Sequence, residues 1–192
     1  MENFDRIKQF DINTLKCQLA SAKIDISKWG AEQAKTPEHL LEEVENGESI
    51  LVTDEAGELL RKVVMGGVSV YYTSSDGKRY RLKEEKQIFK KDNRERRRVL
   101  EQSVLEKMKP NEDPEEAMIR GIREELGIKG EIVLTKIDMN EESEMSTSYP
   151  GLLTQFTRHI YETTLNDEQF RPDGYTEEQP DKSTHFIWEE VK

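Results

Sequence analysis

Cysteine and histidine are scarce in this chain, and their scarcity excludes several kinds of site. Among 192 residues there is one cysteine, Cys17, and there are three histidines, at positions 39, 159 and 185. A single thiol excludes an intramolecular disulfide and a cysteine-based zinc centre. The scattered histidines show no ligand spacing and are expected to be structural or at the surface. A chain without disulfides fits a reducing compartment, so the expected location is cytoplasmic.

Long apolar runs are missing as well. No stretch approaches the roughly 20 apolar residues that a membrane helix requires. Residues 1–10 contain acids where a secretory signal would have its apolar centre. We therefore expect no membrane partner. With 34% hydrophobic residues, the chain can bury one core, which favours a single main domain with an appended N-terminal segment.

Basic residues are outnumbered by acidic ones, 29 against 40, which gives a formal net charge of −11. This balance argues against nucleic acid as a partner. The exception is a basic run at residues 90–98, which contains four arginines. The run is either a solvated linker or a phosphate contact, because guanidinium groups match phosphate oxygens. RNA binding has little support, since no aromatic side chains alternate with the arginines.

Hydrophobic periodicity and turn residues predict a chain of mixed class, α/β or α+β. Helices are expected at residues 11–21 and 37–44, the second introduced by Thr36-Pro37. Residues 140–148 and 166–183 are expected to be loops. The predicted organisation is a helical N-terminal segment, residues 1–47, packed on a main domain, residues 48–192. Strands are predicted at residues 49–53, 59–72, 80–89, 131–139, 152–163 and 184–191.

The most informative segment is residues 112–128, which read as a short helix with both ends marked. Asp113 can cap the N-terminus, Pro114 suits the first helical position, and Gly127 can end the helix. Glu124 and Glu125 then place two carboxylates at the C-terminal end, where the helix dipole disfavours negative charge. A bound divalent cation would explain two acids in that place.

This segment resembles the Nudix box, a sequence pattern that defines a hydrolase family. The pattern is Gly, five residues, Glu, seven residues, Arg-Glu, an aliphatic residue, one residue, Glu-Glu, one residue, Gly and an aliphatic residue. Two positions depart from it: Glu106 stands at the leading glycine, and Gly121 stands at the Glu of the Arg-Glu pair. The matching residues, with spacing intact, are Glu112, Arg120, Ile122, Glu124, Glu125, Gly127 and Ile128.

The resemblance implies a Nudix-like α/β/α sandwich with a mixed β-sheet, which binds Mg²⁺ or Mn²⁺ against a diphosphate. It implies metal-dependent hydrolysis of a nucleoside diphosphate derivative, a small molecule, as the function. Glu112, Glu124 and Glu125 would bind the metal. Arg120 would orient the acidic loop by pairing with one of these carboxylates. Members of the family are often dimers, so a homodimer is one expectation for the oligomeric state.

Gly121 leaves the catalytic base open, because in the family the Glu at this position is commonly a metal ligand and in some members is close to the base. Other members recruit a base from outside the box. The acidic stretch at residues 141–144 is then the most economical source, with Glu142 as the candidate and Glu141 and Glu144 as alternatives. A different class of function also remains open, because Gly121 favours a non-catalytic module that binds a nucleotide derivative or a protein.

Short segments outside the box add a second resemblance. In their order along the chain they look like a poorly characterised group of Nudix-like proteins familiar from plants, which implies no substrate. The segments are residues 29–30, 47–52, 105–110, 148–152 and 185–188.

Overall fold

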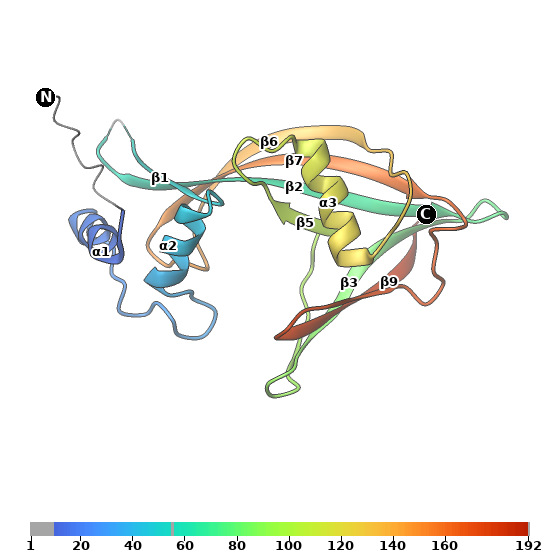
Figure 1. Ribbon diagram of the computed structural model, residues 1–192, viewed down its shortest axis with the longest axis horizontal. Coiled ribbons are helices and arrows are strands. Elements are labelled where there is room, and N and C mark those ends of the chain that lie inside the picture. The colour runs from blue at the N-terminus through green and yellow to red at the C-terminus, as the bar shows by residue number, and fades with distance from the viewer. Residues whose placement is uncertain (1–9, 55, 192) are drawn as a thin grey trace, which may run out of the picture. The chain divides into compact units, whose positions relative to one another are not determined.

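The computed structural model describes residues 10–54 and 56–191, and its ribbon is drawn in Figure 1. The expectation about a secretory signal falls almost wholly on residues 1–9 and so lies outside the described residues. Within the described ranges, no helix is long and apolar enough to cross a membrane. The helices are α1 (Ile12–Ser21), α2 (Pro37–Glu45) and α3 (Pro114–Leu126).

The strands of the described chain form one sheet, in the order β6-β7-β2-β3-β9-β8. Three short strands lie off this path: β1 and β5 pair with β2, and β4 pairs with β3. One sheet combined with helices confirms the predicted α+β class. The strands are β1 (Ile50–Thr53), β2 (Leu59–Thr73), β3 (Arg79–Phe89), β4 (Glu95–Arg96), β5 (Val104–Lys107), β6 (Thr135–Met145), β7 (Leu153–Leu165), β8 (Tyr175–Glu178) and β9 (Lys182–Val191).

The chain divides into two compact units, each with its own hydrophobic core. The first, called the N-terminal unit, comprises the residues up to 64 together with residues 141–157. The second, called the box unit, comprises residues 65–140 together with the residues from 158 onward. The predicted domain boundary at residue 47 remains a prediction.

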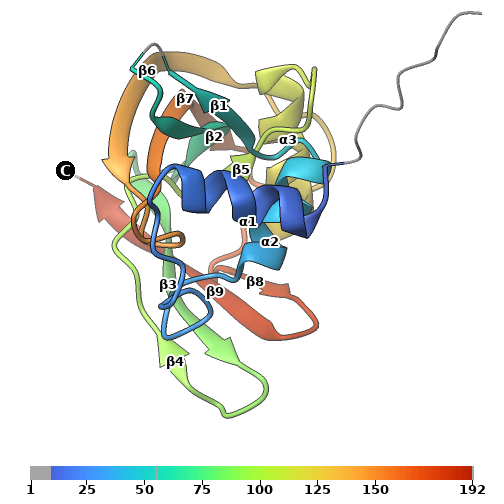
Figure 2. The same ribbon diagram turned by 90° about the vertical axis from the view of Figure 1, so that its left-hand side faces the viewer.

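Helices α1 and α2 of the N-terminal unit lie side by side, as Figure 2 shows. Their starts follow local capping rules. The Asp11 side chain accepts a hydrogen bond from Thr14 N at 2.8 Å, and Thr36 forms a capping box with His39. Trp29 is buried in this core, and its indole Nε1 donates to the Pro150 carbonyl oxygen at 3.0 Å. The core residues are Leu15, Leu19, Trp29, Leu40, Tyr149 and Leu152.

In the box unit, helix α3 packs against β5, and Figure 1 shows it crossing β2 and β5. Strand β2 carries two glycines where the helix approaches. A Cβ atom at Gly66 would lie 2.4 Å from Cε of Met118, a buried residue of α3. The missing side chain therefore lets the helix lie close to the sheet. The pairing of β2 with β5 places Glu106 opposite Gly66.

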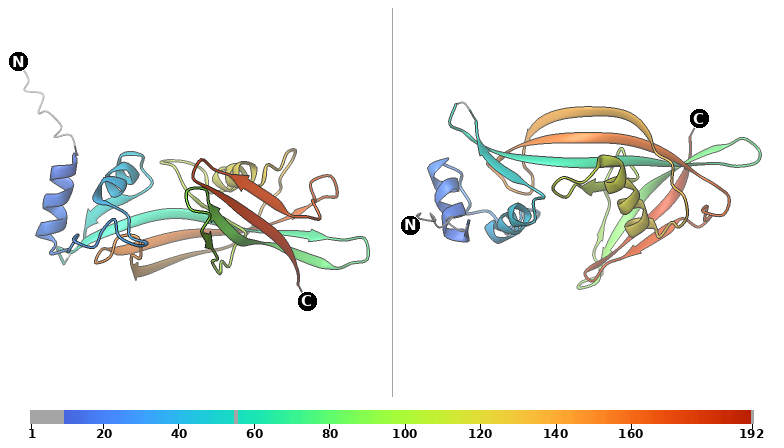
Figure 3. Two further views of the ribbon diagram at one scale, coloured as in Figure 1. Left: turned by 90° about the horizontal axis from the view of Figure 1, so that it is seen from below. Right: turned by 45° about the horizontal axis from the view of Figure 1, so that its top comes forward.

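A β-bulge interrupts the pairing of β3 with β9, two antiparallel strands that run together in Figure 3. The register shifts between Glu84, which lies opposite Phe186, and Lys86, which lies opposite His185. In a regular strand, residues three apart point to opposite faces. Because the bulge adds one residue, Glu84 and Gln87 are both buried, with 6% and 3% of their surface exposed.

Two predicted loops are wrong. Residues 140–145, expected to be loop, belong to strand β6, which starts at Thr135 rather than at residue 131. Ten of the eleven residues of β6 are exposed, so the strand shows no alternation of apolar and polar residues from which it could be recognised. The predicted loop at residues 166–183 contains the short strand β8, which pairs with β9. The other predicted strands are confirmed with shifts of one or two residues at most of their ends.

We expect Gly174→Ala to destabilise the chain far more than Gly77→Ala. Both glycines have positive φ, +80° and +83°, which costs an alanine about 1–2 kcal/mol. At Gly174 the new Cβ would also lie 1.9 Å from the backbone oxygen of Phe186, whereas nothing lies within 4 Å of it at Gly77. Chemical denaturation should give a loss larger by at least about 2 kcal/mol for Gly174→Ala. Equal losses would contradict the packing of β8 against β9.

Candidate functional site

Helix α3 carries the box, and its two ends form as the sequence predicts. Oδ1 of Asp113 accepts hydrogen bonds from the backbone N–H groups of Glu115 at 2.9 Å and Glu116 at 3.2 Å. Gly127 ends the helix with φ +62°, in the left-handed region that favours glycine. The apolar side of the helix is buried in the core of the box unit. Its buried residues are Ala117, Met118, Gly121, Ile122 and Leu126.

Arg120 binds three carboxylates at once. Its Nε donates to Glu112 at 2.8 Å, and its Nη1 donates to Glu106 at 2.7 Å and to Glu124 at 3.3 Å. The side chain is 19% exposed, so these pairs are partly withdrawn from water. The hydrogen bonds that Arg120 donates to Glu112 and Glu106 raise the pKa of Arg120, which keeps it charged. One guanidinium thereby ties the loop before α3, strand β5 and the helix together.

Glu112 is fully engaged by its neighbours. Besides its bond to Arg120 Nε, it accepts at its other oxygen from Arg120 Nη2 at 3.1 Å and from the backbone N–H of Lys109 at 2.9 Å. The hydrogen bonds from Arg120 hold the pKa of Glu112 below its usual range. Glu112 therefore positions Arg120 in this structure, and its role as a metal ligand remains a prediction.

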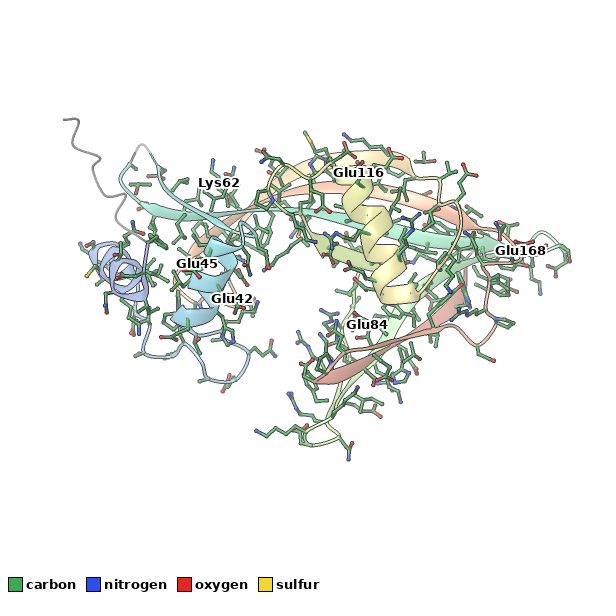
Figure 4. All side chains as sticks on the ribbon, viewed as in Figure 1. Glu42, Glu45, Lys62, Glu84, Glu116 and Glu168 are labelled. Carbon is green, nitrogen blue, oxygen red and sulfur yellow. The ribbon has the colours of Figure 1, made fainter. Side chains whose placement is uncertain are left out.

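A pocket with a volume of about 300 Å³ opens beside the C-terminal end of α3. Figure 4 labels Glu116 near the start of the helix and Glu84 close to its other end. The pocket wall contains five carboxylates and two cationic side chains, so it is acidic overall. The lining residues are Glu84, Gln87, Arg98, Leu100, Ser103, Leu105, Glu106, Glu124, Glu125, Glu177, Gln179, Lys182 and Thr184.

Two lining residues have unusual environments. Burial, reinforced by the nearby charges of Glu177, Glu106 and Glu84, raises the pKa of Glu125 to about 8. Thr184 is 2% exposed, and its buried hydroxyl has no hydrogen-bond partner among the described residues. Buried hydroxyl groups are nearly always bonded. A carboxyl group with disfavoured ionisation and an unpaired hydroxyl in one pocket point to a ligand that would satisfy both.

The donor atoms suit a hard divalent cation. Carboxylate and hydroxyl oxygens are the ligands that Mg²⁺ and Mn²⁺ take, and a nearby 2+ charge would favour the ionised form of Glu125. Among the described residues, no three acidic, histidine or cysteine side chains are gathered closely enough to hold a metal as they stand. Glu124 and Glu125 fit a cation by their chemistry and by their place in the pocket.

The basic run is largely paired with carboxylates. Arg98 forms an ion pair with the buried Glu84, and its Nε donates to Glu84 at 2.9 Å. Arg97 lies 3.5 Å from Glu85 and 3.4 Å from Glu95. Most of the run is thus a solvated segment that balances acids, as one of the two alternatives predicted. Arg98 differs because it lines the pocket, where its guanidinium can meet an anionic ligand.

Glu142, the candidate base, is exposed and lies in strand β6 rather than in a loop. It belongs to the N-terminal unit, whereas Glu112, Arg120, Glu124 and Glu125 belong to the box unit. The predicted role of Glu142 remains a prediction. Arg120 brings Glu106 of β5 together with the box residues of α3 by hydrogen bonding to both Glu106 and Glu124.

Several pocket residues were not predicted. Thr184 could have been found, because it lies two residues before the buried Phe186 on a predicted strand and so shares its face. Glu84 and Gln87 could not, since only the bulge in β3 brings both to the pocket. Glu177, Gln179 and Lys182 lie in the hairpin of β8 and β9, whose first strand was expected to be loop.

We expect the raised pKa of Glu125 to make stability depend on pH in the metal-free protein. A carboxyl group whose pKa rises from 4.5 to about 8 on folding favours the folded state below pH 4.5, and that contribution is lost as pH rises toward 8. Glu125→Gln should therefore raise Tm at pH 8 by at least about 3 °C, with a smaller gain at pH 5. Thermal unfolding with a chelator would measure this. Equal gains at both pH values would contradict the burial of an ionisable Glu125.

Comparisons with known proteins give structural likeness alone. No protein-family model matches the chain, and no curated protein matches it. A solved structure described as a Nudix hydrolase from Listeria monocytogenes is 13% identical, with 67% of this chain and 77% of that chain covered and a TM-score of 0.41. The Ap4A hydrolase of C. elegans is 17% identical, with 66% and 79% covered and a TM-score of 0.35.

A third similar structure is the Nudix domain of Shewanella oneidensis NrtR, solved with ADP ribose. It is 5% identical, with 66% of this chain and 71% of that chain covered and a TM-score of 0.34. At these identities and TM-scores the likeness transfers no activity or ligand to this chain. Two of these three structures are described as Nudix proteins, and the likeness to them is one of fold alone.

Proposed function

We propose that the chain is a metal-dependent hydrolase of a nucleoside diphosphate derivative, with its active site in the pocket beside α3. One observation carries the proposal: the box carboxylates Glu124 and Glu125 line a single acidic pocket, together with Glu106, which Arg120 holds in place. An arrangement of oxygen ligands around a cavity is what a hard cation and a phosphorylated substrate require.

Each of these residues has a proposed role. Glu124 and Glu125 bind the cation, which when bound would neutralise charge on the diphosphate. Arg120 is a positioning residue, because it holds Glu112, Glu106 and Glu124. The sequence-based roles of Glu112 as a further metal ligand and of Glu142 as the base belong to the same proposal.

The pocket wall also offers contacts to the rest of a substrate. Arg98 and Lys182 supply positive charge that suits phosphate oxygens, and Gln179 offers an amide that can donate and accept. The wall contains no aromatic side chain among the described residues. It therefore suits the diphosphate and sugar portions of a nucleotide derivative better than stacking with a base.

A second candidate function is a module that binds a nucleotide derivative without hydrolysing it. Gly121 favours this alternative, because helix α3 carries no carboxylate at that box position. Such a module would keep the pocket and its cation but would not turn the ligand over.

Hydrolysis of ADP-ribose and Ap4A with Mg²⁺ or Mn²⁺ tests the first proposal. We expect turnover by the wild-type chain and a loss of at least about 100-fold in kcat/KM for Glu124→Gln and for Glu125→Gln. Glu116→Gln is the matched control, since Glu116 is an exposed residue of the same helix and does not line the pocket. Chromatography of the released nucleotides would measure the rates.

Three other results would point elsewhere. Full activity in Glu124→Gln and Glu125→Gln would place the active site outside the pocket. Equal losses in Glu116→Gln would indicate damage to the helix rather than loss of a ligand. Absence of turnover in every protein, with a rise in Tm when ADP-ribose and Mn²⁺ are added, would establish the binding module.

A further inference from the structure

The two residues that depart from the Nudix box lie against each other. Gly121 is buried on α3, on the side that faces β5. A Cβ atom at this position would lie 3.3 Å from Cβ of Glu106, 3.6 Å from its Cγ, and 3.3 Å from Cγ1 of Val104. Carbon atoms normally approach to about 3.5–4.0 Å. The stem of Glu106 and the side chain of Val104 therefore closely border the space that a side chain at position 121 would enter.

Gly121 lowers the stability of helix α3, and its packing gives a reason for a glycine at this position. Within a helix, glycine is less favourable than alanine by about 1 kcal/mol. Position 121 lies in the interior of α3, away from both helix ends. Its φ is not positive, so the backbone does not require glycine there. The close approach of Glu106 and Val104 remains as the reason for it.

The carboxylate of Glu106 enters the site that the box forms. Strand β5 fixes its backbone, because Glu106 pairs with Gly66 of β2. Its Oε1 accepts from Arg120 at 2.7 Å, and its side chain lines the same pocket as Glu124 and Glu125. The side chain is 25% exposed, so it is neither a buried structural group nor a freely solvated one.

An independent feature of the pocket points to a ligand. The hydroxyl of Thr184 is buried, lines the pocket and has no hydrogen-bond partner among the described residues. Thr184 belongs to β9 and lies outside the Nudix-box segment, so this observation is independent of the sequence resemblance. An oxygen that lacks a partner in an acidic pocket is suited to bind a cation or one of the waters that a cation holds.

We propose that Glu106 supplies, from strand β5, the carboxylate that helix α3 lacks at Gly121. Positions 106 and 121 have exchanged a glycine and a glutamate, and the cation-binding set of the pocket is Glu106 with Glu124 and Glu125. The cation-binding part of this inference rests on the proposed function. The exchange explains why the two departures occur together, because a side chain at position 121 would lie in tight contact with Glu106.

If Glu106 replaces the glutamate that is missing at position 121, the presence of Gly121 does not imply loss of the cation site. Restoring a glutamate at 121 in the presence of Glu106 would force two side chains into one space and two carboxylates together. The single change Gly121→Glu therefore cannot restore the site, whereas Gly121→Glu combined with Glu106→Gly can.

A double-mutant cycle tests the proposal. Mn²⁺ binding would be measured by titration calorimetry for the wild-type chain, Glu106→Gly, Gly121→Glu and the double variant. We expect each single change to weaken Mn²⁺ binding at least about tenfold. The double variant should bind within about threefold of wild type. Tm should follow the same order, with Gly121→Glu the least stable protein.

Glu106→Gln keeps the proposal testable if a glycine variant fails to fold, because glutamine preserves the shape of the side chain and removes its charge. It should also weaken Mn²⁺ binding at least about tenfold. Glu116→Gln is again the control and should bind as wild type does. The proposal is overturned if the wild-type chain binds no Mn²⁺, if Glu106→Gln binds it normally, or if Gly121→Glu alone binds it more tightly.

The same proteins separate this inference from the proposed hydrolase. If the Mn²⁺ affinities follow the expected cycle but no protein hydrolyses ADP-ribose or Ap4A, the hydrolase proposal fails and the exchange stands. If wild type hydrolyses one of them and Glu106→Gln has normal activity and normal Mn²⁺ affinity, the exchange fails and the hydrolase stands.

Discussion

The guanidinium of Arg120 is the interaction on which the site depends. It holds carboxylates from the loop before α3, from β5 and from α3 itself. Three acids this close together would repel one another, and a partly withdrawn cation among them offsets that repulsion. Arginine suits this position because its planar group offers several donors in fixed directions. It joins the side chains of Glu106 and Glu112 to the helix.

Two carboxyl groups of the pocket, those of Glu84 and Glu125, differ in how their negative charge is stabilised. Glu84 is buried and its charge is balanced by Arg98. Glu125 has no such ion pair among the described residues, and its ionisation is disfavoured. Withdrawal of such a carboxyl group from water costs free energy whenever the group is ionised. A cation would make the ionised form favourable, so binding it would also release a proton near neutral pH. Under the proposed function, metal affinity would therefore depend on pH through Glu125.

Glu106 and Gly121 bear on the choice between a hydrolase and a binding module. A missing box glutamate alone suggests a degenerate site. Glu106 and Val104 both border the space beside Gly121, and Glu106 also lines the pocket, so the proposed exchange keeps a carboxylate at this place. Under this proposal the number of acids around the pocket is kept, although one of them comes from a strand instead of the helix. This favours a site that still binds a ligand over a surface that has lost its function.

The sequence by itself determined the limits of the box helix, because Asp113 and Gly127 act through bonds and dihedral angles within a few residues of themselves. It also predicted most strands, from their apolar residues and the turn residues between them. It missed β6, since exposure of both faces leaves no pattern. Only the tertiary structure decided the pocket. The bulge in β3 turns Glu84 and Gln87 inward, and it arises where β3 pairs with β9. The contact of Glu106 with Gly121 likewise depends on how a strand packs against a helix. Neither can be predicted from the residues adjacent in sequence.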